Sequence, residues 1–328
     1  HWMVHSFPTR RSSDLAATGW LVGEPHRGLA AMFTMMNAER LMVGMQGLGI
    51  AGAAYQQAAA YAKERLQGRS ADGSRSPVAI IEHDDVRRML LTIRGFVEGG
   101  RALAGWVAIQ LDRSKYHADP DIRADADGLV ALLTPIIKGA FTDMGFESAV
   151  LAQQVFGGHG YIREWGMEQY VRDARIAQIY EGTNGVQAMD LVGRKLELGG
   201  GAIVSGFFDM ISSDLDRFVA SPHASVIGEA TRKSLALLSE ATSALRSSGS
   251  EQAGAVAVDF QRLFALVALG WMWTRMAAAA VDDLSPLHVA KRAVALFFAE
   301  RVLPQTQGLA ASVAAGRRST ITLATEAF

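Results

Sequence analysis

The chain has 328 residues, of which 49% are hydrophobic and 20% are charged, and its formal net charge is -1. This length is enough for one large domain or two ordinary ones. The balance of 32 basic against 33 acidic residues gives no electrostatic reason to expect a nucleic-acid or anionic-membrane partner. Because the chain has no cysteine, it has no disulfide, thiolate nucleophile or cysteine-bound metal. The many Ala, Leu and Met residues and few prolines favour a soluble, mostly helical protein, compatible with a cytoplasmic location.

The first fifteen residues do not resemble the rest of the chain. The stretch from Val4 to Leu15 is polar and basic without periodicity, and it resembles the translation of a sequencing adapter. We therefore expect residues 1–15 to be a non-native segment. No apolar segment follows the Arg10-Arg11 pair, which argues against a twin-arginine export signal. Residues 19–28 have the pattern of a short strand and a turn.

Helical periodicity dominates from Leu29 onwards, and a polar loop at 67–77 and an acidic loop at 119–127 interrupt it. The expected helices cover 29–66, 86–111, 128–156, 171–180, 186–195, 204–218, 224–246, 254–282 and 287–302. Long antiparallel helices with short connections form bundles. The sequence therefore predicts an all-α fold, with a domain boundary where LGGGAI at 198–203 breaks the pattern.

Two features of the first long helix have alternative interpretations. The 22 residues from Leu41 to Ala62 carry no charge and are long enough to span a membrane. Their glutamines favour a helix buried among other helices, because polar groups in lipid are costly. Residues 47–52, GLGIAG, also match the dinucleotide-binding pattern G-x-G-x-x-G, but no strand precedes them. We interpret these small residues as a place where another helix packs closely.

The stretch from Gln154 to Leu196 carries the most informative chemistry. It begins with a Gly-Gly pair that ends a helix and allows close backbone approach, and it continues to the EGTNG segment at 181–185. A carboxylate at a helix end, beside backbone N–H donors, is suited to act as a general base. The alternative is a solvated turn in which Thr183 caps the next helix, and spacing alone favours this alternative. His159 fits a packed loop residue, and we expect no metal site.

The same stretch resembles the C-terminal signature of the acyl-CoA dehydrogenase family. The likeness extends back through QVFGG at 154–158, YAKERLQGRS at 61–70 and MNAERLMVG at 36–44, and covers about residues 19–196. It is greatest to the larger bacterial members with a helical C-terminal extension, among them the methylthiopropanoyl-CoA dehydrogenases. The resemblance implies the family's C-terminal helical bundle at 29–197 and an additional helical domain at 198–328. It also implies that residues 16–28 are a remnant of the family's middle β-domain.

The resemblance implies an activity and a cofactor. Family members bind FAD and remove two hydrogens from the α and β carbons of an acyl-CoA thioester. Glu181 matches the glutamate that abstracts the α-proton while the β-hydrogen leaves as hydride to the flavin. The family polarises the thioester carbonyl with the backbone N–H of this glutamate and a flavin hydroxyl. The resemblance further implies an acyl-CoA substrate, an electron-transfer flavoprotein partner, and a homo-oligomer in which subunits share flavin sites.

Further cofactor residues are implied one at a time. Arg65 matches an arginine that reaches the FAD pyrophosphate of a neighbouring subunit, although its pattern alone indicates a surface ion-pair residue. Gln154, Gly157 and Gly158 match a flavin contact across the same interface. Thr183 matches a hydroxyl that contacts FAD beside the base.

The resemblance also implies three substrate-binding residues. Arg40 matches an arginine near the mouth of the active site, and Tyr180 matches a residue that lines the acyl pocket. Gly182 matches a substrate contact beside the base. Gln67-Gly68 stands where many members have an aromatic flavin contact. The family's N-terminal helical and middle β-domains are not in this chain. We therefore expect a truncated, inactive enzyme that binds FAD weakly or not at all. One alternative is a non-catalytic helical module for assembly or partner binding. Another is an acyl-CoA oxidase of the same fold, which the residues named above do not distinguish from a dehydrogenase.

Overall fold

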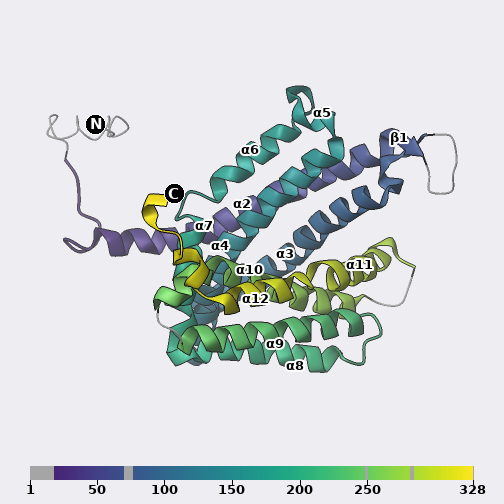
Figure 1. Cartoon of the computed structure of the whole chain (residues 1–328). Helices are drawn as coiled ribbons and strands as arrows, with labels where there is room; N and C mark the ends of the chain where they lie inside the picture. The colour runs from purple at the N-terminus through teal and green to yellow at the C-terminus, as the bar shows by residue number, and fades with distance from the viewer. Residues whose placement is uncertain (1–17, 70–76, 248–249, 281–283, 328) are drawn as a thin grey trace. The chain divides into compact units, whose positions relative to one another are not determined.

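The computed structural model describes residues 18–69, 77–247, 250–280 and 284–327 (Figure 1). It is 84% helical with two short strands, which confirms the all-α prediction. Residues 1–39 and 40–328 form two separate compact units. In the first unit, residues 18–27 contain a turn but no strand, so the strand predicted at 19–28 is wrong. The adapter-like segment predicted at 1–15 lies outside the described residues.

The long helices of the N-terminal half are α2 (Gly28–Glu64), α3 (Asp84–Tyr116) and α4 (Pro120–Phe156). α3 packs along α4. An antiparallel pair of strands, β1 (Leu66–Arg69) and β2 (Pro77–Ala79), links α2 through the short helix η2 (Ile80–Glu82) to α3. Both strands fall within or beside the loop predicted at 67–77, so that prediction is wrong at the two ends of the segment.

α4 begins eight residues before its predicted start at 128–156 because its first turn is well capped. The Asp119 side chain accepts a hydrogen bond from the Asp121 N–H at 2.9 Å. Pro120 follows in the first turn, where its missing N–H costs nothing. The acidic loop predicted at 119–127 is therefore wrong, because its residues form the cap and the first turns of the helix.

Glycines bring α2 and α4 together backbone to backbone. A Cβ at Gly47 would lie 2.7 Å from the carbonyl oxygen of Phe141, and a Cβ at Gly145 would lie 2.6 Å from the carbonyl oxygen of Gly47. A side chain at either position would force the helices apart. This contact confirms close helix packing at Gly47, the first residue of the pattern at 47–52, whereas a Cβ at Gly49 would meet nothing within 4 Å.

A series of short elements connects α4 to the C-terminal half. They are α5 (Gly158–Tyr161), η3 (Arg163–Trp165), α6 (Met167–Ala177), α7 (Asn184–Gly193) and η4 (Lys195–Gly201). α6 packs along α4, and α7 contacts both α4 and α10. Leu198, Gly199 and Gly200 have non-helical backbone angles, so the break in the helical pattern predicted at 198–203 is present. The domain boundary placed there stays a prediction.

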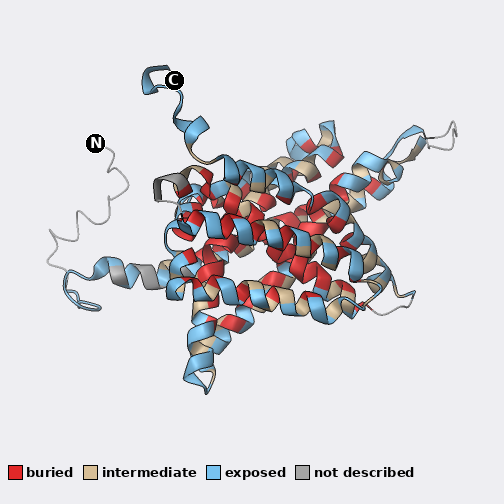
Figure 2. Ribbon diagram, turned by 60° about the horizontal axis from the view of Figure 1, so that its bottom comes forward, coloured by how far each residue is buried: buried red, intermediate tan, exposed pale blue. Residues whose placement is uncertain are grey.

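The C-terminal helices are α8 (Ala202–Phe218), α9 (Ser225–Ser247), α10 (Ser250–Ala279), α11 (Pro286–Phe297), the π-helical segment η5 (Phe298–Val302) and α12 (Gln305–Ala315). Two short 3₁₀ helices, η6 (Arg318–Ile321) and η7 (Thr325–Ala327), follow. α10 contacts α3, α4 and α7 as well as α8, α9 and α12. Buried residues concentrate in the middle of the helices (Figure 2). Trp271 and Trp273 of α10 are fully buried.

Within the described part of the chain, α4 and α10 are long and apolar enough to cross a membrane by length and composition. In both helices most of the apolar stretch is buried inside the bundle. Burial of this kind is also typical of the core helix of a globular domain.

Candidate active site

Glu181 and Gly182 form a tight turn between α6 and α7. Both have positive φ angles, 56° and 84°. A left-handed backbone costs a non-glycine residue about 1–2 kcal/mol, so the surroundings must hold Glu181 in this conformation. The Asn184 N–H closes the turn by donating to the Gln178 carbonyl at 3.1 Å. The Thr183 hydroxyl accepts from the Val186 N–H at 3.4 Å and caps α7, as the alternative prediction for this residue required.

A buried lysine contacts this turn from α4. Lys138 has no exposed surface, and its Nζ donates to the Gly182 carbonyl oxygen at 2.7 Å and to Asn184 Oδ1 at 2.9 Å. Burial lowers the pKa of Lys138 to about 8; the carboxylates of Asp143 and Glu181 oppose the shift, and the charge of Arg40 adds to it. A neutral amine still has two N–H groups, so both hydrogen bonds can persist after the proton leaves.

Two amide side chains hold the rest of the turn. The Asn184 Nδ2 lies 3.1 Å from the Gly139 carbonyl oxygen and 2.7 Å from Asp143 Oδ1. Gln187 Nε2 donates to the carbonyl oxygens of Glu181 and Gly182 at 3.3 and 3.4 Å. Both carbonyls therefore accept bonds from buried side chains, which fixes the backbone that carries the partly exposed Glu181 carboxylate.

The predicted substrate residues lie in two different environments. Arg40 is 8% exposed and pairs with Asp190 at 3.6 Å, while its Nε has no hydrogen-bond partner in the described structure. Tyr180 is 38% exposed, and its hydroxyl donates to the side chain of Gln46 on α2. Tyr180, Gly182 and Glu181 thus share one accessible turn, whereas Arg40 lies in the interior of the bundle.

A second cluster lies at the C-terminal end of α4. Arg65, Gln154 and Gly157 line one cavity of about 370 Å³, which Tyr61 and His83 also line. Within the described residues, no carboxylate pairs with the Arg65 guanidinium. The cavity therefore combines an available cation, an amide and exposed backbone.

The Gly-Gly pair beside this cavity is open to close approach. Gly157 has a φ of 57° and a ψ of -137°, a conformation that favours glycine. Gly157 and Gly158 are both exposed, and a Cβ at either would meet nothing within 4 Å. The pair thus presents bare backbone next to Arg65 and Gln154.

Aromatic side chains support the same end of α4. Tyr61 stacks on Phe156 with ring centroids 4.1 Å apart, and its hydroxyl lies 2.9 Å from Nδ1 of His159. The His159 ring stacks on Trp165 at 4.7 Å. His159 is therefore a packed residue, as its sequence context predicts, but it lies in the short helix α5 rather than in a loop.

The two clusters are well separated. Gln154 follows Lys138 by 16 residues on the same helix, which is about 24 Å at 1.5 Å per residue. The cofactor residues expected from the sequence therefore fall into two groups. Thr183 lies beside Glu181, whereas Arg65, Gln154, Gly157 and Gly158 lie together at the other cluster.

The sequence pattern did not predict a role for Lys138, Asn184 or Gln187. Lys138 is the one charge in the run from Gly128 to Phe141, and a lysine is almost never buried unless it is paired. That isolated charge was the available signal. Asn184 carried none, because its partners come from a helix more than 40 residues away. Gln187 bonds to the carbonyls of Glu181 and Gly182, six and five residues before it, in a turn whose backbone shape the residue pattern does not give.

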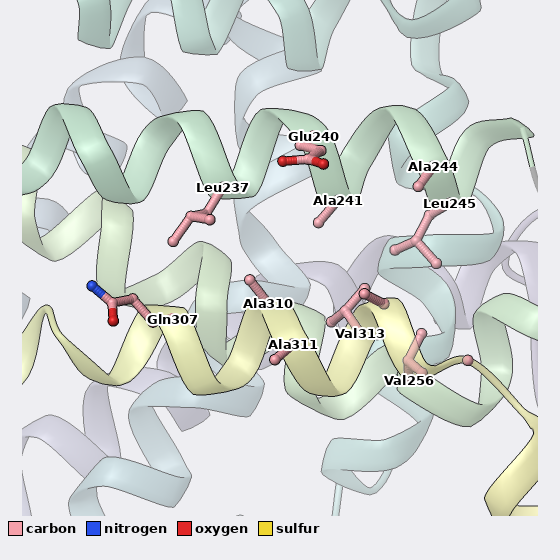
Figure 3. A pocket seen from close by; sticks show the side chains of 12 residues that line it. Leu237, Glu240, Ala241, Ala244, Leu245, Val256, Gln307, Ala310, Ala311 and Val313 are labelled. Atoms are coloured by element: carbon pink, nitrogen blue, oxygen red, sulfur yellow. The ribbon is translucent and has the colours of Figure 1, made fainter.

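A further cavity of about 470 Å³ lies between α9 and α12 (Figure 3). Leucine, valine and alanine side chains such as Leu237, Ala310 and Val313 form most of its lining, and Glu240 is the one titratable residue among those that line it. This lining offers no paired groups for acid–base chemistry, so we assign no active site there.

Comparison with known proteins identifies both halves of the chain. Residues 26–196 match the family model for the acyl-CoA dehydrogenase C-terminal domain, and residues 207–324 match that for an acetyl-CoA dehydrogenase C-terminal-like domain. The chain is 40% identical to a 3-methylmercaptopropionyl-CoA dehydrogenase of Ruegeria pomeroyi over 92% of this chain and 53% of that protein. The chain thus spans about half the length of the curated relatives it matches.

Two crystal structures share the fold. Caenorhabditis elegans ACDH-11 in complex with C11-CoA aligns with a TM-score of 0.72 and 20% identity, over 86% of this chain and 46% of that one. An acyl-CoA dehydrogenase from Bacillus anthracis complexed with FAD aligns with a TM-score of 0.66 and 15% identity, over 89% of this chain and 50% of that one. The family models and the relative from Ruegeria pomeroyi confirm the resemblance seen in the sequence. The family model for the acyl-CoA dehydrogenase C-terminal domain matches about half of this chain, so the chain belongs to the acyl-CoA dehydrogenase family.

Proposed function

We propose that the chain is the C-terminal part of an FAD-dependent enzyme that introduces a double bond between the α and β carbons of an acyl-CoA thioester. The observation that carries the proposal is the Glu181 turn, in which a partly exposed carboxylate stands on a strained backbone held by buried side chains. Such a turn keeps a base in one position without reorganisation during the reaction. The family membership supports an oxidoreductase of this class.

Each residue at or near the turn has its own role in the proposed reaction. The Glu181 carboxylate takes the α-proton, and its own backbone N–H donates to the thioester oxygen as negative charge develops there. When bound, FAD supplies the acceptor for the β-hydrogen, which leaves as hydride. Tyr180 and Gly182 line the acyl group, and Arg40 contributes positive charge from the interior.

The second cluster fits the phosphate end of FAD. The Arg65 guanidinium has the fixed fork of donors that suits a pyrophosphate. Gln154 offers an amide, and the open Gly157-Gly158 backbone allows a cofactor to approach closely. These residues would hold the cofactor, while Thr183 would contact it beside the base.

A shared flavin site explains the separation of the two clusters. The two groups of cofactor residues lie against positions of α4 that are about 24 Å apart along the helix, so they do not converge on the same part of one flavin. We therefore propose a homo-oligomer in which Thr183 of one subunit and Arg65 of another complete each site. An electron-transfer flavoprotein would then reoxidise the flavin, and we expect this to occur in the cytoplasm.

The test uses the longer protein of which this chain is the proposed C-terminal part. Glu181→Gln should abolish the loss of flavin absorbance on mixing with acyl-CoA. Glu229→Gln, which changes an exposed carboxylate on α9, serves as the control and should reduce the flavin normally. Undiminished flavin reduction by Glu181→Gln would overturn the assignment of the base.

A non-catalytic helical module is the second candidate, because residues 40–328 form a compact unit with its own buried core. Titration of the chain with FAD addresses it. Tight binding with a structured flavin spectrum would favour the enzyme. We expect weak or no binding by the chain alone, because each cluster supplies only part of a site.

A further inference from the structure

The C-terminal helices contact both helices that hold the Glu181 turn. α10 packs along α7, where a Cβ at Gly254 would lie 3.3 Å from the Met189 sulfur. It also packs on α4, where Arg262 pairs with both carboxylate oxygens of Glu147 at 2.5 and 2.8 Å. The helix α10 therefore contacts both α4 and α7, the helices that hold the Glu181 turn.

One contact between α10 and α4 lies beside Lys138. Gln261 of α10 is 2% exposed, and its Nε2 donates to the Pro135 carbonyl oxygen at 2.9 Å. A Cβ at Gly139 would lie 2.3 Å from Oε1 of the same side chain. The Gln261 amide thus fills the space beside the turn of α4 that runs from Pro135 to Gly139, and Lys138 is part of that turn.

This turn of α4 needs support from outside the helix. Pro135 has no N–H, so α4 lacks one of its internal hydrogen bonds at this place. The same turn carries the two groups that meet the catalytic segment, namely the Lys138 ammonium and the Gly139 carbonyl that accepts from Asn184. A shift of this turn would therefore be transmitted to Gly182 and Asn184.

We propose that Gln261 is a positioning residue through which the C-terminal helices hold the Glu181 turn in its left-handed conformation. Gln261 fixes the Pro135–Gly139 turn, which in turn fixes Gly182 through Lys138 and Asn184. The C-terminal helices then serve catalysis without touching substrate or flavin. The inference rests on the proposed function for the role of the turn, whereas the contacts themselves do not depend on it.

Hydrogen exchange of the backbone amides in the 328-residue chain tests the proposal. Gln261→Met keeps the size of the side chain but removes the donor. We expect exchange of the amides at 182–187 to become faster by about tenfold or more, the effect of one lost buried hydrogen bond. The Asn184 N–H, which donates to Gln178, is the most direct reporter.

Trp273→Phe is the matched control. Its indole N–H donates from the same helix to the Gly95 carbonyl at 2.9 Å, but that carbonyl belongs to α3. This variant should leave exchange at 182–187 unchanged once both variants are compared at equal global stability. Equal effects of the two variants on these amides, or no effect of Gln261→Met, would overturn the proposal.

A second measurement covers the case in which Gln261→Met folds poorly. Gln261→Asn keeps the amide, but its shorter side chain places the amide farther from Pro135. The pKa of Lys138 in this variant is followed by NMR of labelled lysine. A loosened turn admits water, so the pKa of Lys138 should rise towards its ordinary value, and an unchanged pKa would contradict the proposal.

Neither the hydrogen-exchange measurement nor the NMR titration needs flavin or substrate. If Glu181→Gln retains flavin reduction while Gln261→Met loosens the turn, the proposed function fails and the positioning role stands.

Discussion

The Lys138 ammonium lies 2.7 Å from the carbonyl oxygen of Gly182, so a buried charge in the middle of α4 meets the backbone one residue after Glu181. Burial of an ammonium is unfavourable unless hydrogen bonds replace its hydration. Here those bonds go to the Gly182 carbonyl and the Asn184 side chain, both in or beside the turn. The unfavourable burial and the strained turn therefore depend on each other.

Replacing this lysine should change how stability depends on pH. The pKa of Lys138 is about 8 in the folded protein, against an ordinary value of 10.5. Between these values the unfolded chain binds more protons than the folded one, so the free energy of unfolding rises with pH. The penalty of the buried charge is fully present below pH 8 and is lost as the pH rises to 10.5.

Urea denaturation at a series of pH values measures this effect. The stability of the wild type relative to Lys138→Met should rise between pH 8 and 10.5 and stay constant below that range. Lys63→Met, which removes an exposed lysine, should show no such trend. A constant difference for Lys138→Met across the whole range would show that Lys138 titrates normally.

Glu181→Gly should stabilise the protein although it removes the proposed base. Glycine adopts a φ of 56° without steric cost, so we expect a gain of about 0.5–1 kcal/mol in the free energy of unfolding. Glu181→Gln keeps the backbone strain and removes the attraction between the Glu181 carboxylate and Lys138, so it should give no such gain. Chemical denaturation compares the three proteins, and a destabilised Glu181→Gly would show that the side chain, rather than the backbone, determines the energy here.

The contact between α2 and α4 makes two nearby glycines respond in opposite ways. Gly47→Ala places a Cβ 2.7 Å from the Phe141 carbonyl oxygen and should cost about 1–3 kcal/mol. Gly49→Ala meets nothing within 4 Å and should gain up to about 1 kcal/mol from its higher helix propensity. Thermal denaturation of both variants checks the prediction, which similar melting temperatures would contradict.

The Gly-Gly pair beside the Arg65 cavity gives a second matched comparison. Gly157→Ala forces an alanine into a conformation with positive φ and should cost about 1–3 kcal/mol. Gly158→Ala has no positive φ and open space around its Cβ, so its stability should change little. Calorimetry of the two variants would contradict this account if Gly157→Ala melted at the wild-type temperature.

Much of the fold could be predicted because helical periodicity is a local signal. The helices over 86–111 and 224–246, the break at 198–203 and the cap at Thr183 all follow from neighbouring residues. The start of α4 was also local, but the Asp119-Pro120 cap was interpreted as a loop. α12 lies beyond 287–302, the last helix expected from the sequence, and was therefore missed.

In the candidate site, too, the local features could be predicted and the contacts between distant residues could not. The order of residues at 180–183 indicated a turn with a carboxylate, and the resemblance suggested a use for it. The hydrogen bonds from Lys138, Asn184 and Gln187 could not be predicted, because they depend on how α4, α7 and the turn meet in space. The link from Gln261 to Pro135 joins residues 126 positions apart and left no local signal.

The separation of Arg65 from Glu181 determines how mixtures of damaged subunits should behave. In a dimer that shares its sites as proposed, one chain with Glu181→Gln and one with Arg65→Ala put both lesions into one site and leave the other site intact. Two inactive proteins would then complement each other when their subunits are exchanged, up to half of the activity per mixed dimer. A single chain that carries both substitutions would instead spoil both sites of any dimer it joins.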